Sequence, residues 1–334
     1  MTSRPGIINR FLVQTTALLL FTGSMIAART QGTNNEPRPT NQAKILLTAV
    51  DKDGRFISTL RVEDLRLLQD GAPQDIDNFQ RIAGRILSLA ILIDASASQE
   101  RTLPGQKLAA TYFVDSIMRS DGDEAAIGTF TGTLTVEQKL THDVTLLRQA
   151  IERAKFVPPS GYAGGGVVIG PPPPVSRTSA ALAGTTAIWD AVIAACDDVL
   201  SQSSGQRRRA IILLTDGEDT ASESKMASAV ERAIKDDVVI YAVGIGDRDF
   251  SGVNKDGLGK LPERTGGRAF FPKKVSDLTA VFGQIGQELR TQYLISYRPA
   301  SRAGRPGKIK VEIVNPDLRK ADVQLFYPQI LPRK

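Results

Sequence analysis

The sequence of 334 residues contains one cysteine and one histidine. A single cysteine excludes an intrachain disulfide and a cysteine-rich zinc site, and the helical spacing of Cys196 from Ile193 and Leu200 predicts a core position. With His142 as the only histidine, the chain has no His-Glu-x-x-His zinc motif, and it also lacks a Gly-x-Ser-x-Gly nucleophile elbow. Because the common hydrolase signatures are missing, we expect that the protein is not an enzyme.

The charge balance also lacks a concentrated basic patch. The chain has 42 basic and 36 acidic side chains, for a formal net charge of +6. The tightest basic cluster, Arg207–Arg209, leads directly into an apolar segment, which is typical of a solvated loop. Since no helix-turn-helix or aromatic-basic pattern is present, we expect no nucleic-acid partner.

Long apolar runs are scarce, and the first one is at the N-terminus. Two arginines precede the apolar stretch Phe11–Ala28, which ends in small residues and is typical of an export signal. Met25 and Ile26 stand where a small residue is preferred, so an uncleaved membrane anchor is the alternative. Either interpretation predicts an extracytoplasmic location, in the periplasm or secreted.

Buried strands and amphipathic helices alternate through the middle of the chain. Ile86–Ile93, Ala210–Leu214 and Val238–Ile245 are nearly continuous apolar runs, as expected for central parallel strands covered on both faces. Two strands flanking residues 131–133 predict a hairpin. Helical spacing predicts helices over Leu108–Met118, Val144–Phe156, Thr186–Leu200, Ser224–Lys235, Leu258–Arg264 and Val275–Arg290. The alternation predicts an α/β fold with a doubly wound, mostly parallel sheet.

Both ends of the chain are predicted to form β structure. Short strands are expected over Lys44–Val50 and Leu65–Leu68, and alternating strands in the tail over residues 292–297, 308–314 and 322–327. Each set is too small to be stable alone, so we expect them to pack into one flanking β unit. The predicted organisation is a signal peptide at 1–28, a linker at 29–43, an N-terminal β unit at 44–83, the α/β domain at 84–291 and C-terminal β strands at 292–334.

Oxygen-bearing side chains follow two of the buried strands. Asp94, Ser96 and Ser98 come directly after the first strand, and Asp216 follows the second. Thr186 opens the helix before that second strand. The carboxyl ends of strands form the ligand crevice of a doubly wound sheet, so these residues are expected to converge there. Oxygen-only ligation suits Mg²⁺, with Mn²⁺ and Ca²⁺ as alternatives, rather than zinc or copper.

The pattern Asp-x-Ser-x-Ser, a distant threonine and Thr-Asp-Gly resembles the metal-ion-dependent adhesion site (MIDAS) of von Willebrand factor A (VWA) domains. The resemblance covers about residues 86–290 and implies a Rossmann-like VWA domain. It also implies that Asp94, Ser96, Ser98, Thr186 and Asp216 bind a divalent cation. Thr186 is preferred over Thr185 because Gly-Thr-Thr-Ala-Ile-Trp-Asp aligns best in that register. The flanks resemble an exported bacterial subset of the family known from acidobacterial genomes.

Each piece of the pattern has a simpler explanation. Asp94 or Ser98 could cap the following helix, and Asp216 with Asp219 could cap the next one. Asp51 and Asp53 resemble the start of a calcium loop, but a hairpin turn is favoured because the twelfth-position glutamate is missing. The glycine- and proline-rich insertion at 157–177 departs from the family pattern and is either functional or disordered.

An open cation with two carboxylate ligands is nearly neutral and attracts a further carboxylate. We therefore expect a binding module that captures an Asp or Glu side chain of a protein partner. The insertion, Arg101 and Glu218 are expected to shape the choice of partner. Two alternatives remain open: a structural envelope or assembly scaffold with incidental metal, and a metal-dependent hydrolase.

Overall fold

The computed structural model describes residues 42–159, 161–164, 167–168, 184–203, 206–245, 252–299 and 307–331. The predicted signal peptide, nearly all of the predicted linker and the later part of the insertion lie outside these ranges. Within them, no helix combines the length and the apolar character needed to cross a membrane.

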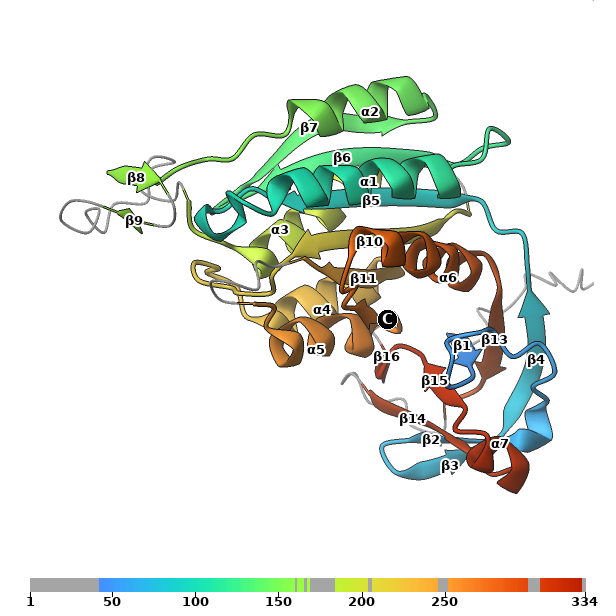
Figure 1. Ribbon diagram of the computed structural model, residues 1–334. Coiled ribbons are helices and arrows are strands. Elements are labelled where there is room, and N and C mark those ends of the chain that lie inside the picture. Colours follow the sequence, from blue (N-terminus) through green and yellow to red (C-terminus); the bar gives the residue numbers. More distant parts are fainter. Residues whose placement is uncertain are drawn as a thin grey trace, which may run out of the picture. The chain divides into compact units, whose positions relative to one another are not determined.

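A six-stranded sheet forms the centre of the fold (Figure 1). Its strands, in spatial order, are β12 (Ala269–Phe270), β11 (Val238–Gly244), β10 (Arg208–Thr215), β5 (Leu87–Asp94), β6 (Glu124–Phe130) and β7 (Leu134–Thr141). All neighbours are parallel except β6 and β7, which form an antiparallel pair. Strands β5 and β11 are buried along their whole length, as their apolar sequences predicted, and β6, which was predicted only as one strand of a hairpin, is buried as well.

Helices cover both faces of this sheet, as the alternation of strands and helices predicted. One core contains α1 (Leu103–Ile117), α2 (Val144–Arg153) and α6 (Leu278–Arg290). The other contains α3 (Ile188–Ala194), α4 (Met226–Lys235) and α5 (Lys255–Thr265). Short helical turns are η1 (Val62–Asp64), η2 (Ala97–Gln99), η3 (Ala195–Val199), η4 (Leu200–Gln202) and η5 (Val275–Asp277).

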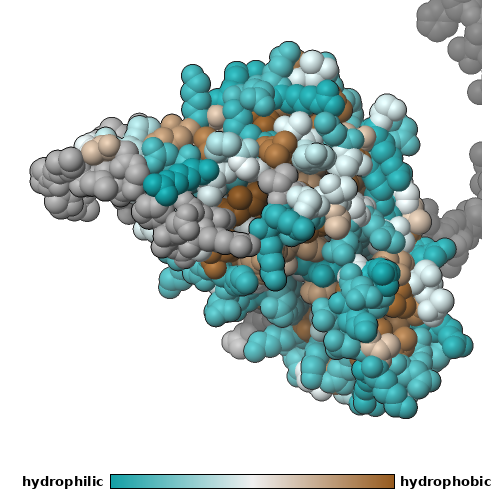
Figure 2. Space-filling model, viewed as in Figure 1, coloured by the Kyte–Doolittle hydropathy of each residue, from teal (hydrophilic) through white to brown (hydrophobic). Residues whose placement is uncertain are grey.

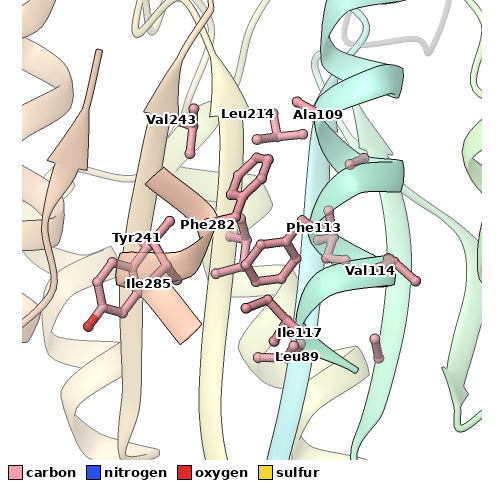
Figure 3. Close-up of a cluster of buried hydrophobic side chains, with 14 of the residues drawn as sticks. Leu89, Ala109, Phe113, Val114, Ile117, Leu214, Tyr241, Val243, Phe282 and Ile285 are labelled. Atoms are coloured by element: carbon pink, nitrogen blue, oxygen red, sulfur yellow. The ribbon is translucent and has the colours of Figure 1, made fainter. Parts of the chain in front are cut away.

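Aromatic packing fixes two helices against the sheet. Phe113 of α1 and Phe282 of α6 meet edge to face, with ring centroids 5.2 Å apart. Both rings are buried and pack with Leu89, Leu214 and other strand residues (Figure 3). Full burial of one such ring stabilises the fold by about 1.5–3 kcal/mol, so this contact holds α1, the helix that follows the first oxygen-rich loop.

Strands from the two ends of the chain form the flanking β unit. One sheet has the order β15 (Gln324–Phe326), β1 (Ala43–Val50), β13 (Gln292–Tyr297) and β4 (Ile76–Ile82). The other has the order β16 (Ile330–Leu331), β14 (Gly307–Ile313), β2 (Leu65–Gln69) and β3 (Ala72–Gln74). The two sheets share an apolar core that includes Leu47, Leu67 and Ile295. The mixed α/β fold with a flanking β unit from both termini is therefore confirmed.

Several local features differ from the sequence expectations. The helix predicted from Leu108 begins five residues earlier, at Leu103, because Pro104 is favourable in a first turn. The helix predicted over Thr186–Leu200 starts at Ile188 and continues as the π-helical turn η3. Between the second and third strands predicted in the tail, the chain forms a short helix, α7 (Pro316–Lys320), that the sequence did not predict. The insertion contains a two-stranded ribbon, β8 (Tyr162–Gly164) and β9 (Val167–Val168), that its sequence did not predict.

Candidate metal centre

The candidate metal centre lies where two neighbouring parallel strands end. β5 ends at Asp94 and β10 ends at Thr215. From β5 the chain proceeds through β6 and β7 on one side and then returns to β10 and β11 on the other. Such a reversal is where a doubly wound sheet opens a ligand crevice at the carboxyl ends of its strands.

The carboxylate of Asp94 is fully buried and held by two hydrogen bonds. Its Oδ1 accepts from the backbone N–H of Ser96 at 3.0 Å, and its Oδ2 accepts from Thr215 Oγ1 at 2.5 Å. Burial raises the pKa of Asp94 to about 7, against the opposing effect of hydrogen bonds from Ser96 and Thr215. The nearby negative charge of Asp216 raises this pKa further, which indicates that the two carboxylates face one site.

Asp216, the second predicted carboxylate, is 2% exposed. Burial raises its pKa, while hydrogen bonds from Ser98 and Gln99 act in the opposite direction. Its Oδ1 accepts from the backbone N–H of Glu218 at 3.2 Å, and its carbonyl accepts from the backbone N–H of Asn254 at 2.9 Å. Hydrogen bonds to Glu218 and Asn254 thus hold Asp216 in place, and its side chain is also bonded to the loop that follows β5.

The two predicted serines lie together on that loop. Ser96 Oγ and Ser98 Oγ are 3.2 Å apart, with Ser96 buried and Ser98 exposed. Ser98 also bonds to Asp216. The structure therefore brings Asp94, Ser96, Ser98 and Asp216 into one cluster of oxygen atoms, open to solvent on the side of Ser98.

Thr186 is buried between the two loops. Its backbone N–H donates to Thr220 Oγ1 at 3.0 Å, and its carbonyl accepts from the backbone N–H of Thr220 at 2.8 Å. Two residues earlier, the carbonyl of Gly184 accepts from the backbone N–H of Ala97 at 3.0 Å. The segment that carries Thr186 is therefore bonded to the loops after both β5 and β10.

A network of polar side chains beneath the first loop was not predicted. Gln106 Oε1 accepts from the backbone N–H of Asp94 at 3.1 Å, and Gln106 Nε2 donates to Gln99 Oε1 at 2.5 Å. Gln99 Nε2 in turn donates to Ser98 Oγ at 3.1 Å, and Thr102 Oγ1 donates to Gln99 Oε1 at 2.5 Å. All three supporting residues are buried. Their polar character, from η2 to the first turn of α1, was the available signal.

Of the residues proposed as helix caps, only Asp219 caps a described helix, and that helix is α3 rather than the next one along the chain. Asp219 Oδ1 accepts from the backbone N–H of Ile188 at 2.7 Å at the start of α3, and from Ser222 Oγ at 2.6 Å. No side chain caps η2 or α1. Asp94, Ser98 and Asp216 therefore point to the shared cluster rather than to helix ends, which leaves a ligand role as the better account of them.

The donor set fits a hard divalent cation. The buried carboxylates of Asp94 and Asp216 lie close enough to repel each other. Within the described ranges, neither has a basic side chain at ion-pair distance. Burying uncompensated negative charge is costly, and a bound cation removes that cost. The described residues hold no group of three or more His, Cys, Asp or Glu side chains that suits a metal ion. The remaining donors would be hydroxyls, as Mg²⁺, Mn²⁺ and Ca²⁺ accept and softer metals do not.

The single histidine and the single cysteine lie away from this cluster. His142 Nδ1 contacts the carbonyl of Asp123 at 2.5 Å. Asp123 immediately precedes β6, so this contact lies at the amino ends of the parallel strands, opposite the candidate site. Cys196 is buried in the core, and burial raises the pKa of its thiol to about 12. Asp51 and Asp53 form a turn in which Asp51 Oδ1 accepts from the backbone N–H groups of Asp53 and Arg55, as the hairpin interpretation predicted.

The first part of the insertion is anchored beside the candidate site. The backbone N–H of Val157 donates to the carbonyl of Ala95 at 3.2 Å, and the Tyr162 hydroxyl donates to the Glu100 carboxylate. Tyr162 also packs against Phe156, with ring centroids 5.3 Å apart. The insertion therefore emerges at the edge of the sheet that carries the site, as its position in the sequence predicted.

One family model matches the chain. Residues 174–284 match the von Willebrand factor type A domain. The matched range includes Thr186 and Asp216, whereas Asp94, Ser96 and Ser98 lie outside it. The structure places the loop carrying these three residues against the matched part. A search of the curated proteins gave no match.

Solved structures with a similar arrangement are distant in sequence. BatB from Bacteroides thetaiotaomicron is 18% identical, with 60% of this chain and 98% of that chain covered and a TM-score of 0.44. A von Willebrand factor type A protein from Catenulispora acidiphila is 14% identical, with coverages of 82% and 70% and a TM-score of 0.47. Proximal thread matrix protein 1 from the mussel byssus, with a zinc-occupied MIDAS motif, is 20% identical, with coverages of 66% and 50% and a TM-score of 0.47.

Proposed function

We propose that this chain is an exported binding module that uses a divalent cation to capture an acidic group of a protein partner. The observation that carries the proposal is the cluster of two buried carboxylates and two serine hydroxyls at the carboxyl ends of β5 and β10, with no basic side chain at ion-pair distance among the described residues. The match of residues 174–284 to the von Willebrand factor type A domain supports the same function. Export rests on the apolar N-terminal segment.

Five side chains would hold the cation: Asp94, Ser96, Ser98, Thr186 and Asp216. When bound, the cation supplies positive charge that attracts a carboxylate of the partner. The two aspartates bring the site close to neutrality, so an incoming Asp or Glu meets little repulsion. Mg²⁺ is the proposed ion because a compact site of few carboxylates and several hydroxyl or water ligands suits it, and Mn²⁺ and Ca²⁺ are alternatives.

The same arrangement favours binding over catalysis. Metal-assisted hydrolysis requires a proton donor or acceptor beside the cation. His142 lies at the opposite edge of the sheet, and Cys196 is buried with a raised pKa. The two aspartates would be engaged as ligands of the proposed cation, and the other groups beside it are hydroxyls and amides, which position ligands but do not exchange protons near neutral pH.

Thermal unfolding of the full-length chain tests the metal-binding part of this proposal. We compare EDTA with Mg²⁺, Mn²⁺ or Ca²⁺ for wild type, Asp94→Ala and Asp198→Ala, since Asp198 is exposed in η3 and serves as the matched control. A ligand at 100 times its Kd stabilises the folded state by about 2.7 kcal/mol. The wild type and the control should gain this stability, and Asp94→Ala should not. An equal response of all three proteins would reject the site.

Capture of an acidic partner is tested by affinity purification in Mg²⁺. Proteins retained by wild type and by Asp198→Ala, but not by Asp216→Ala, are candidate partners. Replacing each acidic residue of a candidate in turn should identify one Asp or Glu whose loss abolishes binding. Retention that is identical for wild type and Asp216→Ala, with metal binding lost in the variant, would support the scaffold alternative instead.

A further inference from the structure

A cavity lies next to the candidate metal centre, at the carboxyl end of β11. Its volume is about 360 Å³, within the range of about 300–1,000 Å³ that small-molecule sites occupy. Ile245, Val253, Phe271 and Leu278 supply most of its wall, from the end of β11, the segment before α5, the segment after β12 and the start of α6. None of the five proposed metal ligands lines this cavity.

Two glycines determine the shape of the cavity. A Cβ at Gly244 would lie 2.7 Å from both Phe271 and Val253, so glycine is required for these two side chains to approach the strand. At Gly105 on α1 the nearest atom to an added Cβ is Ile245 Cγ2 at 3.9 Å, an ordinary contact. The absence of a side chain at Gly105 therefore leaves open space on the α1 side of the cavity.

The rim of the cavity is positively charged. Lys255, Lys273 and Lys274 border it, and the described lining residues include no acidic side chain. Lys255 Nζ lies 5.6 Å from the centroid of the Phe271 ring, a cation–π contact that holds this ammonium group beside the apolar wall. The backbone N–H groups of Lys273 and Lys274 donate to Asp277 Oδ2, which fixes the segment that carries both lysines.

We propose that this cavity binds a small organic anion, a carboxylate attached to an aliphatic or aromatic group. The apolar wall accommodates the hydrocarbon part, and the lysines that border the cavity supply positive charge for its carboxylate. Taken by themselves, the three lysines could be ordinary solvated surface residues, because all of them are exposed. The combination with a concave apolar wall is what selects an apolar anion over a neutral apolar molecule or a simple inorganic ion.

Hydrogen bonds join the cavity to the metal centre without sharing its ligands. The backbone N–H of Ile245 donates to the carbonyl of Thr215 at 3.0 Å, and that of Asn254 donates to the carbonyl of Asp216. Gly105 precedes Gln106, which accepts from the backbone N–H of Asp94. The anion site nevertheless does not depend on a bound cation, and it stands whether or not the proposed function is correct.

Isothermal titration with sodium decanoate in EDTA tests the proposal. A second titrant, the peptide Gly-Gly-Gly-Phe with a free C-terminus, distinguishes a free fatty acid from the C-terminus of a protein as the natural source. Lys255→Gln, Lys273→Gln and Lys274→Gln together should weaken binding about tenfold. The matched control is Lys52→Gln, Lys235→Gln and Lys260→Gln, three exposed lysines elsewhere, which should bind like wild type.

A variant that fills the cavity provides the second arm. Gly105→Leu should abolish binding while leaving the thermal unfolding temperature in EDTA close to that of wild type. Decanol and the peptide amide, which lack the carboxylate, should bind at least tenfold more weakly than their acids. The proposal is overturned if neither acid binds, if the triple lysine variant binds like wild type, or if Gly105→Leu folds and binds unchanged.

Discussion

Replacing Asp94 by asparagine is expected to stabilise the metal-free protein near neutral pH and to abolish its response to metal. Asparagine has the shape of a protonated aspartate and retains a carbonyl that can accept from the backbone N–H of Ser96. The Thr215 hydroxyl, which donates to Asp94 Oδ2, can instead accept from the new amide. The substitution therefore removes a buried negative charge with little change in packing.

The magnitude follows from the raised pKa of the carboxyl. Burial raises the pKa of Asp94 from its ordinary value of 3.8 to about 7, so the folded state holds the proton more tightly than the unfolded state does. The free energy of unfolding therefore falls as pH rises from 3.8 to 7 and is constant above 7, as far as this group is concerned. Each pKa unit corresponds to about 1.4 kcal/mol, which gives a total loss of about 4 kcal/mol.

Urea unfolding in EDTA, followed by the fluorescence of Trp189, measures this effect. Trp189 is the only tryptophan and lies in α3, three residues after Thr186. Between about pH 5 and pH 8 the wild type should lose about 3 kcal/mol relative to Asp94→Asn, because other titrating groups cancel in the difference. Saturating Mg²⁺ should then stabilise the wild type alone. A pH-independent difference between the two proteins would refute the reasoning.

Three further predictions concern single positions. Gly184→Ala should destabilise the protein by about 1–3 kcal/mol, because φ is +78° there and a Cβ would lie 2.6 Å from Pro159. The same change should weaken metal binding; chemical denaturation measures the first effect and Mn²⁺ titration the second. Phe113→Ala should cost about 3–5 kcal/mol through the cavity left against Phe282, and a loss below 1 kcal/mol by urea unfolding would contradict the packing described. Cys196 should react with Ellman's reagent only as fast as the protein unfolds, since its thiol is buried and its pKa is raised to about 12; rapid reaction in native buffer would contradict this.

The sequence was sufficient to predict the fold class because its strands are of two recognisable kinds. The nearly continuous apolar run of β5 is typical of a strand covered on both faces, whereas the alternating residues of β14 indicate one exposed face. The same contrast separated the central sheet from the flanking β unit. Edge strand β4 escaped prediction because its residues are half-buried at most and alternate weakly.

The candidate site was predictable as a group of oxygen-bearing residues, but the network of side chains that supports it was not. Asp94 and Asp216 could be named because each ends a buried strand, and parallel strands present their carboxyl ends together. The roles of Gln99, Gln106 and Thr102 depend on side-chain directions in η2 and at the start of α1, which a sequence does not specify. The capping of α3 by Asp219 was likewise unpredictable, because it joins residues 31 positions apart.

The central claim is tested most directly by Mn²⁺ titration, with the free ion measured by electron paramagnetic resonance. The account predicts one bound Mn²⁺ per wild-type chain and displacement by Mg²⁺. It predicts the same for Asp198→Ala, and no binding for Asp94→Ala, Asp216→Ala or the double variant Ser96→Ala and Ser98→Ala. If folded wild type and these variants leave equal amounts of Mn²⁺ free, the oxygen cluster at the ends of β5 and β10 is not a metal centre.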